Sequence, residues 1–225
     1  MRTAHIPVYR AVMEDSTRWA EATRALLAER RQKLFNFIGS PGAGKTVLLE
    51  ALARELRGRA RFAVIEGDCA GTRDAERLAA QGVQAVQIVT GDGCHLPAES
   101  IHHVLRELPH EGLDFVLVEN VGNLVCPAAF DIGETAKLAV LSVTEGEDKP
   151  LKYPTLFRQA AATVLSKVDL LPHLRFDLAQ CRAALQQVNA AAPVFEVSGK
   201  TGKGIGTFAK WLMTNSSKDW KANTA

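Results

Sequence analysis

The sequence has few cysteines, no long apolar run and almost no excess of charge of either sign. Only four of its 225 residues are cysteine, and in a reducing compartment so few cysteines are typically thiols or metal ligands rather than disulfides. No apolar run approaches the ~20 residues that a membrane-spanning helix needs, and the first residues include no apolar stretch of signal-peptide length. These absences predict a cytoplasmic protein with no membrane partner.

The charge balance excludes a further class of partner. The 27 Lys and Arg residues against 25 Asp and Glu residues give a net charge of +2, which is too small to indicate binding to nucleic acid. The content of 47% hydrophobic and 23% charged residues excludes a mainly disordered chain. No internal repeat or low-complexity tract is present, so the length favours one domain with a short appendage.

Short apolar runs alternate with helical patterns along most of the chain. The runs are nearly continuous in apolar residues, as in parallel strands buried on both faces, and the alternation predicts a doubly wound α/β domain with a mostly parallel sheet. The expected strands are Leu34–Ile38, Phe62–Ile65, Ala85–Val89, Phe115–Val118, Leu138–Val143, Thr163–Leu165 and Val194–Val197. The expected helices are Val12–Lys33, Lys45–Arg57, Thr72–Gln81, Ala98–Glu107, Tyr153–Ala160, Asp177–Asn189 and Ile205–Met213. We therefore expect a helical extension at residues 1–33, the main domain at 34–214 and a flexible polar tail at 215–225.

The segment between the first expected strand and the next helix fits the pattern G-x-x-x-x-G-K-S/T of a phosphate-binding loop. Its residues are Gly39, Ser40, Pro41, Gly42, Ala43, Gly44, Lys45 and Thr46. Glycines let the backbone curl so that its N–H groups point at phosphate oxygens, and the helix adds its positive end. We expect Lys45 to reach the β- and γ-phosphates and the Thr46 hydroxyl to bind Mg²⁺. The loop predicts a P-loop NTPase.

Two later segments favour guanine as the base. The first resembles the N-K-x-D pattern of GTPases, whose Asp accepts the N1–H and amino group that adenine does not present; it reads Ser166-Lys167-Val168-Asp169. Here Ser166 replaces the Asn, which leaves guanine selectivity to be tested. The second follows the last strand, where GTPases place a backbone N–H near the guanine O6, and reads Ser198-Gly199-Lys200. GTP and GDP are therefore the expected nucleotides.

Carboxylates follow two of the expected strands. Glu119 ends a strand where a Walker B acid lies, so it is a candidate for ordering Mg²⁺ or the attacking water. Gly122 follows as the glycine of D-x-x-G does in GTPases, where its N–H faces the γ-phosphate. Asp68 is a second candidate, whereas Asp74 opens a helix and is equally explained as an N-terminal charge. With Lys45, Glu119 and Asp68 as the catalytic candidates and no glutamine after Gly122, we expect slow turnover, near ~10⁻⁴–10⁻² per second.

A cysteine–histidine pair and a third ligand candidate also follow strands. Cys94 and His95 lie in a glycine-flanked loop, and Cys126 lies in another loop at what should be the same edge of the sheet. Thiolate and imidazole ligands suit Zn²⁺ or Ni²⁺ rather than Mg²⁺ or Ca²⁺. A fourth ligand could come from water or from a second chain across a two-fold axis. Cys69 is expected to pack beside Asp68, and Cys181 to lie in the core.

Taken together, these segments resemble the HypB family, GTPases that assist nickel insertion into NiFe hydrogenase. The resemblance covers about Leu34 to Leu212. The stretches that carry it are Gly39–Thr46, Ile65–Asp68, Asp74–Arg77, Gly93–Leu96, Glu119–Pro127 and Glu145–Pro154. The resemblance implies that Cys94, His95 and Cys126 bind Ni²⁺ or Zn²⁺, and that GTP favours a homodimer with the metal at the interface. It also implies two partners, a HypA-like nickel chaperone and the large-subunit precursor of the hydrogenase.

The sequence departs from parts of the family pattern. Some members carry an N-terminal C-x-x-C-G-C nickel motif and others a histidine-rich stretch. This chain has no cysteine before Cys69 and neither feature, so we expect neither tight nickel binding at the N terminus nor nickel storage.

One segment is expected to connect the two sites. Cys126 lies seven residues after Glu119 and four after Gly122, so loss of the γ-phosphate is expected to move Cys126 and change metal affinity. Two alternatives stay open: a urease-type accessory GTPase, and a non-catalytic metal carrier or scaffold. Leu170, Leu171 and Leu174 fit either the core or a dimer face. The loop Glu145–Lys152 either reaches a neighbouring nucleotide or is solvated.

Overall fold

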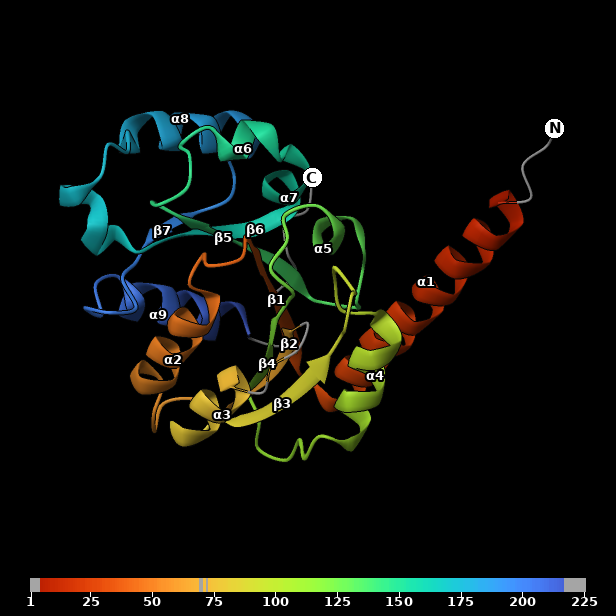
Figure 1. The fold of residues 1–225 in the computed structure, drawn as a ribbon. Helices are drawn as coiled ribbons and strands as arrows, with labels where there is room; N and C mark the ends of the chain where they lie inside the picture. The colour runs from red at the N-terminus through yellow and green to blue at the C-terminus, as the bar shows by residue number, and fades with distance from the viewer. Residues whose placement is uncertain (1–4, 69–70, 72, 217–225) are drawn as a thin grey trace.

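The computed structural model describes residues 5–68, 71 and 73–216. Cys69 and most of the predicted tail therefore lie outside the described residues. The predicted doubly wound α/β architecture is confirmed: within the described residues, seven strands form one parallel sheet in the order β3-β2-β4-β1-β5-β6-β7 (Figure 1). The strands are β1 (Lys33–Gly39), β2 (Phe62–Asp68), β3 (Gln84–Val89), β4 (Phe115–Glu119), β5 (Ala136–Ser142), β6 (Ala160–Ser166) and β7 (Val194–Glu196).

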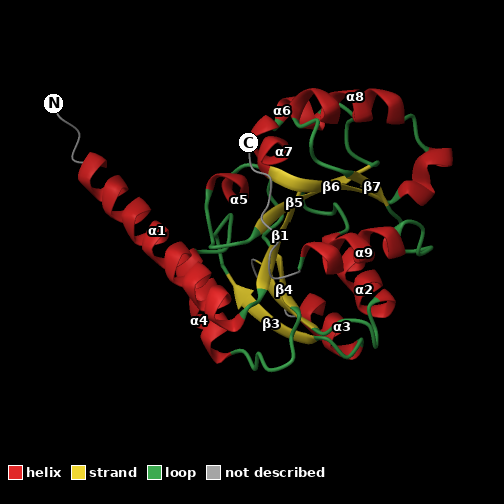
Figure 2. Ribbon diagram, turned by 180° about the vertical axis from the view of Figure 1, so that it is seen from behind, coloured by secondary structure: helices red, strands yellow, loops and turns green. Residues whose placement is uncertain are grey.

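Helices cover both faces of this sheet (Figure 2). They are α1 (His5–Arg30), α2 (Lys45–Glu55), α3 (Arg73–Ala80), α4 (Ala98–Glu107), α5 (Cys126–Ala129), α6 (Lys149–Lys152), α7 (Pro154–Gln159), η1 (Val168–His173), α8 (Leu178–Val188) and α9 (Ile205–Asn215). Residues of α2, α3 and α9 form the core on one face. On the other face α1 and α4 cover the β2–β4 half, while α5, α7 and α8 cover the β5–β6 half.

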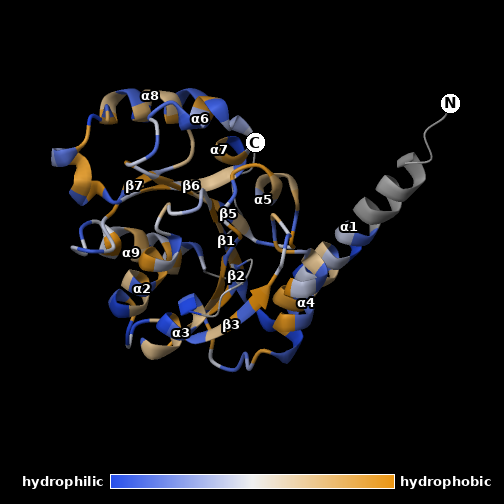
Figure 3. Ribbon diagram, viewed as in Figure 1, coloured by the Kyte–Doolittle hydropathy of each residue, from blue (hydrophilic) through white to orange (hydrophobic). Residues whose placement is uncertain are grey.

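Central strands read as apolar runs because both of their faces are covered. Every residue of β4 is buried, and Figure 3 shows apolar residues concentrated in the strands. This layering exposes only the ends of the central strands, and β1, β2 and β4 all end at the same carboxyl edge. Ligands of open parallel sheets bind at that edge.

The N-terminal helix has different bounds from those predicted. It begins at His5 and ends at Arg30 rather than Lys33. Arg31 takes a left-handed conformation with φ of 56°, and the amide of Gln32 then donates to the Leu27 carbonyl. This is a common way to end a helix, but the left-handed position is usually a glycine, so no residue in the sequence predicted the end of the helix here. The helix packs on α4 and projects outward at its N-terminal end.

Other local expectations have mixed outcomes. The short helix α5 and the turn η1 were not predicted, and β6 already begins at Ala160, where a helix was expected to end. Leu170 and Leu171 pack against the core, whereas Leu174 is 39% exposed. Cys181 is fully buried, as predicted. No helix in the described part of the chain has the length and apolarity to cross a membrane.

Candidate nucleotide and metal site

The phosphate-binding loop lies between β1 and α2 in the conformation that its glycines allow. Gly42 and Gly44 have positive φ values of 73° and 86°, which side chains other than glycine rarely adopt. The ammonium of Lys45 is folded back within 3.3 Å of the Gly39 carbonyl and 3.4 Å of the Ser40 carbonyl. The Lys45 ammonium therefore lies within the loop, where a bound phosphate group would take the place of these two carbonyl contacts.

A cavity of about 520 Å³ opens beside this loop. The Thr46 hydroxyl lies at its floor, 3.0 Å from Glu119 Oε1 and 3.1 Å from Asp74 Oδ2. Asp74 is held in turn by Arg77, whose guanidinium also binds both carboxylate oxygens of Glu50. The sequence indicated Thr46 and Glu119 as Mg²⁺ candidates, and the structure brings these two side chains into contact. The sequence left Asp74 equally explained as an N-terminal charge. The structure places Asp74 at the Thr46 hydroxyl.

Asp68 and Gly122 also line the cavity. Asp68 is the last residue of β2 and is partly exposed. Gly122 lies against the phosphate loop so closely that a Cβ atom there would be 2.9 Å from the Pro41 Cα. The sequence therefore predicted correctly that both residues lie at the phosphate end of the sheet.

Sequence reasoning missed one carboxylate of this cavity, Glu66. It lies directly opposite Glu119 in the pairing of β2 with β4, and Glu66 Oε2 and Glu119 Oε2 have no hydrogen-bond partner among the described residues. Burial, with the nearby Glu119 carboxylate, raises the pKa of Glu66 to about 8. Burial raises the pKa of Glu119 to about 7, although Lys45 opposes the shift. Glu66 directly follows the predicted strand Phe62–Ile65, and sequence reasoning did not single it out. Only the pairing of β2 with β4 shows that Glu66 lies opposite Glu119.

The two base segments lie side by side at the other end of the phosphate loop. The Val168 amide donates to the Val197 carbonyl over 3.2 Å, which joins the Lys167–Asp169 turn to the Ser198–Lys200 loop. Lys167 has a left-handed φ of 59°, and its ammonium lies 2.6 Å from the Gly42 carbonyl. The Lys167 side chain therefore runs across the phosphate loop, while its role beside a base ring stays a prediction.

Ser166, which replaces the Asn of the N-K-x-D pattern, makes a hydrogen bond to the phosphate loop. The buried Ser166 hydroxyl donates a 2.6 Å hydrogen bond to the Ala43 carbonyl, so this side chain fastens the base segment to the phosphate loop.

The Glu145–Lys152 loop also contacts the phosphate loop of its own chain, because Ser40 Oγ donates to Glu145 Oε2 over 2.6 Å. Glu145 is thus neither fully solvated nor directed away from its own site.

Cys94, His95 and Cys126 come together at the same edge. The Cys94 sulfur lies 3.7 Å from His95 Nδ1, and a hydrogen bond that the Cys94 thiol donates to the Cys126 sulfur raises the pKa of Cys94. The His95 ring stacks on Phe130 with 3.9 Å between ring centroids, and burial lowers its pKa. A neutral imidazole is the form that binds metals. Sequence reasoning missed Phe130, which follows α5.

The three side chains are neighbours, but they do not form a finished cage. In the described part of the chain, no three His, Cys, Asp or Glu side chains stand in an arrangement that could hold a metal ion. Cys94 is exposed and Cys126 is half-buried, so a tetrahedral site built on these residues would need side-chain movement or further ligands.

The fold and the phosphate loop together define a P-loop nucleotide-binding protein. Residues 33–196 match the family model described as CobW/HypB/UreG, nucleotide-binding domain. The hydrogenase maturation factor HypB of Escherichia coli is 47% identical over 203 residues, which cover 90% of this chain and 70% of that protein. The chain belongs to this family, within its HypB branch.

Two comparisons with Helicobacter pylori agree with this placement. Its hydrogenase/urease maturation factor HypB is 40% identical over 195 residues, which cover 84% of this chain and 79% of that protein. A crystal structure of HypB from the same species in complex with nickel superposes with a TM-score of 0.87 at 36% identity, covering 94% of this chain and 99% of that one.

Proposed function

We propose that this protein is a GTP-binding and GTP-hydrolysing metallochaperone that assists nickel insertion into NiFe hydrogenase. The observation that carries the proposal is the single segment 119–126, which begins with a carboxylate at the Thr46 hydroxyl and ends with a cysteine beside Cys94. A nucleotide site and a thiol site thus share one short piece of chain. The relatives named above as hydrogenase maturation factors support the same role.

The donor set in the cavity fits a hard divalent cation. Thr46, Glu119 and Asp74 bring one hydroxyl and two carboxylates together, and Glu119 Oε2 is buried without a partner. Oxygen ligands of this kind suit Mg²⁺, which when bound would neutralise charge that develops on the phosphates. Asp68 also lines the cavity and is a further candidate ligand. Lys45 would bind the β- and γ-phosphates, and Asp169 with the Ser198–Lys200 loop would select guanine.

In this proposal nickel is cargo rather than a resident cofactor. Cys94, His95 and Cys126 would take Ni²⁺ or Zn²⁺, and the missing ligand would come from a second copy when GTP favours the dimer. A HypA-like chaperone would supply the nickel, and the hydrogenase large-subunit precursor would receive it, in the cytoplasm.

The shared segment gives the two sites a route for coupling. Gly122 contacts the phosphate loop at Pro41, so release of the γ-phosphate would free it, and Cys126 four residues later would shift. Metal affinity would then differ between the GTP and GDP states, and linkage requires metal to change the preference between the nucleotides by the same factor.

A second candidate function is nickel delivery to urease. The relative from Helicobacter pylori is named for both hydrogenase and urease maturation. Both functions use the same nucleotide and metal sites, so they differ only in the protein that receives nickel.

The test is a Ni²⁺ titration of the metal-free protein, first with GDP and then with a non-hydrolysable GTP analogue, read by thiolate-to-metal charge-transfer absorbance. We expect the affinity to differ between the two nucleotides, and we expect Cys126→Ala to abolish that difference. GTP turnover should be lost in Lys45→Ala. Equal titrations with normal turnover would leave a GTPase that does not gate metal, and no thiolate band would remove the metal assignment. Absence of turnover in the wild type would favour the carrier or scaffold reading.

A further inference from the structure

Two asparagines flank Gly122 and connect its segment to the loop that carries Cys94 and His95. Asn120 Oδ1 accepts a hydrogen bond from the backbone amide of Leu96, 3.1 Å away. Asn123 Nδ2 lies 3.5 Å from the Cys94 carbonyl, and its Oδ1 accepts a 2.8 Å bond from the Val125 amide. The glycine next to the phosphate loop therefore lies between two attachments to the metal-site loop.

Asn120 is the stronger of these attachments because its side chain is buried and makes three hydrogen bonds. Its side chain is only 1% exposed. Besides Leu96, its Oδ1 accepts from the Val121 amide over 3.0 Å, and its Nδ2 donates to Asn36 Oδ1 over 3.1 Å. A buried amide that satisfies three partners cannot reorient without breaking one of them.

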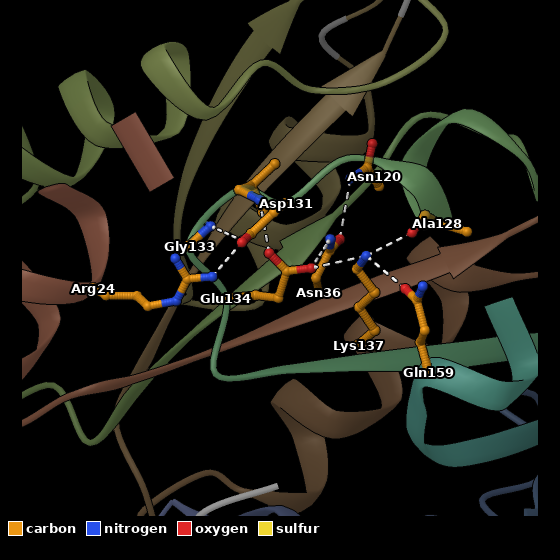
Figure 4. A network of polar contacts seen from close by, with 10 residues as sticks. Arg24, Asn36, Asn120, Ala128, Asp131, Gly133, Glu134, Lys137 and Gln159 are labelled. Carbon is orange, nitrogen blue, oxygen red and sulfur yellow. Dashed lines mark hydrogen bonds and ion pairs between the residues drawn. The ribbon is translucent and has the colours of Figure 1, made fainter. Parts of the chain in front are cut away.

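The same network continues to the segment that carries Cys126 (Figure 4). Asn36 donates to Glu134 over 3.4 Å, and Glu134 pairs with Lys137 at 3.7 Å. Lys137 donates a 2.6 Å bond to the Ala128 carbonyl, in the helix α5 that begins at Cys126. Asn120 is therefore connected to both metal-site segments, directly to one and through Asn36, Glu134 and Lys137 to the other.

The Leu96 end of this connection is also rigid. Leu96 is fully buried, and its side chain fills the space over Gly67. Gly67 lies between Glu66 and Asp68, and all three line the phosphate cavity. His95 thus directly precedes a residue that is fixed at both its amide and its side chain to the walls of the nucleotide site.

We propose that Asn120 is a positioning residue that holds the Cys94–His95 loop and α5 in register with the phosphate loop, with Asn123 as a second tie. This role rests on the proposed function, because it assumes that nucleotide state and metal affinity are coupled. When Gly122 moves, the asparagines on either side of it carry the movement to Cys94 and His95 as well as to Cys126. Without the Asn120 side chain, both sites keep their own residues, but the Cys94–His95 loop is no longer held in position relative to the phosphate loop.

The first experiment measures Ni²⁺ affinity of wild type, Asn120→Ala and Asn189→Ala, each with GDP and with a non-hydrolysable GTP analogue. Asn189 is the matched control, because its amide donates to the carbonyls of Phe157 and Ala160 at the amino edge of the sheet. We expect the ratio of the two affinities to fall toward 1 in Asn120→Ala and to stay at the wild-type value in Asn189→Ala. An unchanged ratio in Asn120→Ala overturns the positioning role, whereas a ratio of 1 in wild type overturns the proposed coupling itself.

Amide hydrogen exchange tests the connection without metal. In the GDP-bound, metal-free protein we expect the Leu96 amide to exchange at least about tenfold faster in Asn120→Ala than in Asn189→Ala, because its buried acceptor is gone. Equal protection overturns the connection even where nickel coupling is present. If Asn120→Ala does not fold, Asn123→Asp serves instead, since it keeps the acceptor for Val125 and loses the donor to Cys94. A wild-type affinity ratio in folded Asn123→Asp contradicts the proposal.

Discussion

Leu96 packs directly over Gly67, so closely that a Cβ atom at position 67 would lie 2.6 Å from Leu96 Cγ. Gly67 is buried in β2 between two carboxylate residues of the nucleotide cavity, and Leu96 directly follows the metal-ligand candidate His95. This packing contact therefore acts together with the Asn120 hydrogen bond to the Leu96 amide in holding the metal-site loop against the nucleotide cavity.

The first prediction concerns this contact. We expect Gly67→Ala to displace the Leu96 side chain and to destabilise the protein by about 1–3 kcal/mol, as overpacking of a filled core does. Urea unfolding of the metal-free protein measures the change. Gly58→Ala is not a suitable control because Gly58 has a positive φ of 73°, so Ala80→Gly on the exposed end of α3 serves as a mild backbone control. A Gly67→Ala protein as stable as wild type would show that the loop repacks freely.

The second prediction concerns the Ser166 hydroxyl. Ser166→Ala removes the bond to the Ala43 carbonyl and leaves that buried acceptor unsatisfied. We expect Ser166→Ala to lose about 1 kcal/mol of nucleotide-binding free energy, which corresponds to roughly fivefold weaker binding. Titration with a fluorescent GDP analogue measures it, with ADP as competitor to test base selectivity. Because Asp169 is the proposed guanine partner, selectivity against ADP should survive in Ser166→Ala. Loss of selectivity instead would show that Ser166 itself reads the base.

The third prediction concerns Glu119. Glu119→Gln keeps an oxygen for the Thr46 hydroxyl but removes the negative charge that faces Lys45 and the proposed Mg²⁺. We expect GTP turnover to fall at least about 100-fold, or about 2.7 kcal/mol of barrier, while GDP still binds in the absence of Mg²⁺. Glu55→Gln is the matched control, since Glu55 pairs with Arg59 on the surface. Turnover near the wild-type rate in Glu119→Gln would assign the catalytic charge to Asp68 or Asp74.

The fourth prediction concerns pH. The pKa of Glu66 rises from 4.5 to about 8 on folding, and that of Glu119 to about 7. Between the unfolded value of 4.5 and these raised values, the folded state binds more protons than the unfolded state. The stability of the nucleotide-free, metal-free protein should therefore fall as pH rises from about 4.5 to 8. At about 1.4 kcal/mol per pH unit the Glu66 contribution is at most about 5 kcal/mol.

Glu66→Gln provides the comparison for this prediction, because an amide at position 66 has no proton to lose. Urea unfolding at pH 5, 6, 7 and 8 should show a shallower decline in Glu66→Gln than in wild type, with the exposed Glu111→Gln as control. A wild-type decline that Glu66→Gln leaves unchanged would assign the dependence to other groups.

The local parts of the fold and site could be predicted from the sequence. The strand-to-helix context of Gly39–Thr46 is written in adjacent residues, so its conformation follows from glycine positions and apolar runs alone. The Cys94–His95 pair and Cys126 were expected at one edge because parallel strands end together. Helix ends were less predictable: Arg31 ends α1 in a conformation usually taken by glycine.

By itself, the sequence determined which residues are candidates for binding phosphate, guanine and Zn²⁺ or Ni²⁺, because those chemistries depend on residue type and short spacing. Only the tertiary structure decided that Asp74, in the first turn of α3, contacts Thr46, that Glu66 lies opposite Glu119, and that Ser166 bonds to Ala43. The sheet order brings together residues that are 28 to 123 positions apart in the chain, and it also joins the Asn120 side chain to the Leu96 backbone amide. No local pattern encodes such pairs, since they arise only when several strands and loops meet at one edge of the sheet.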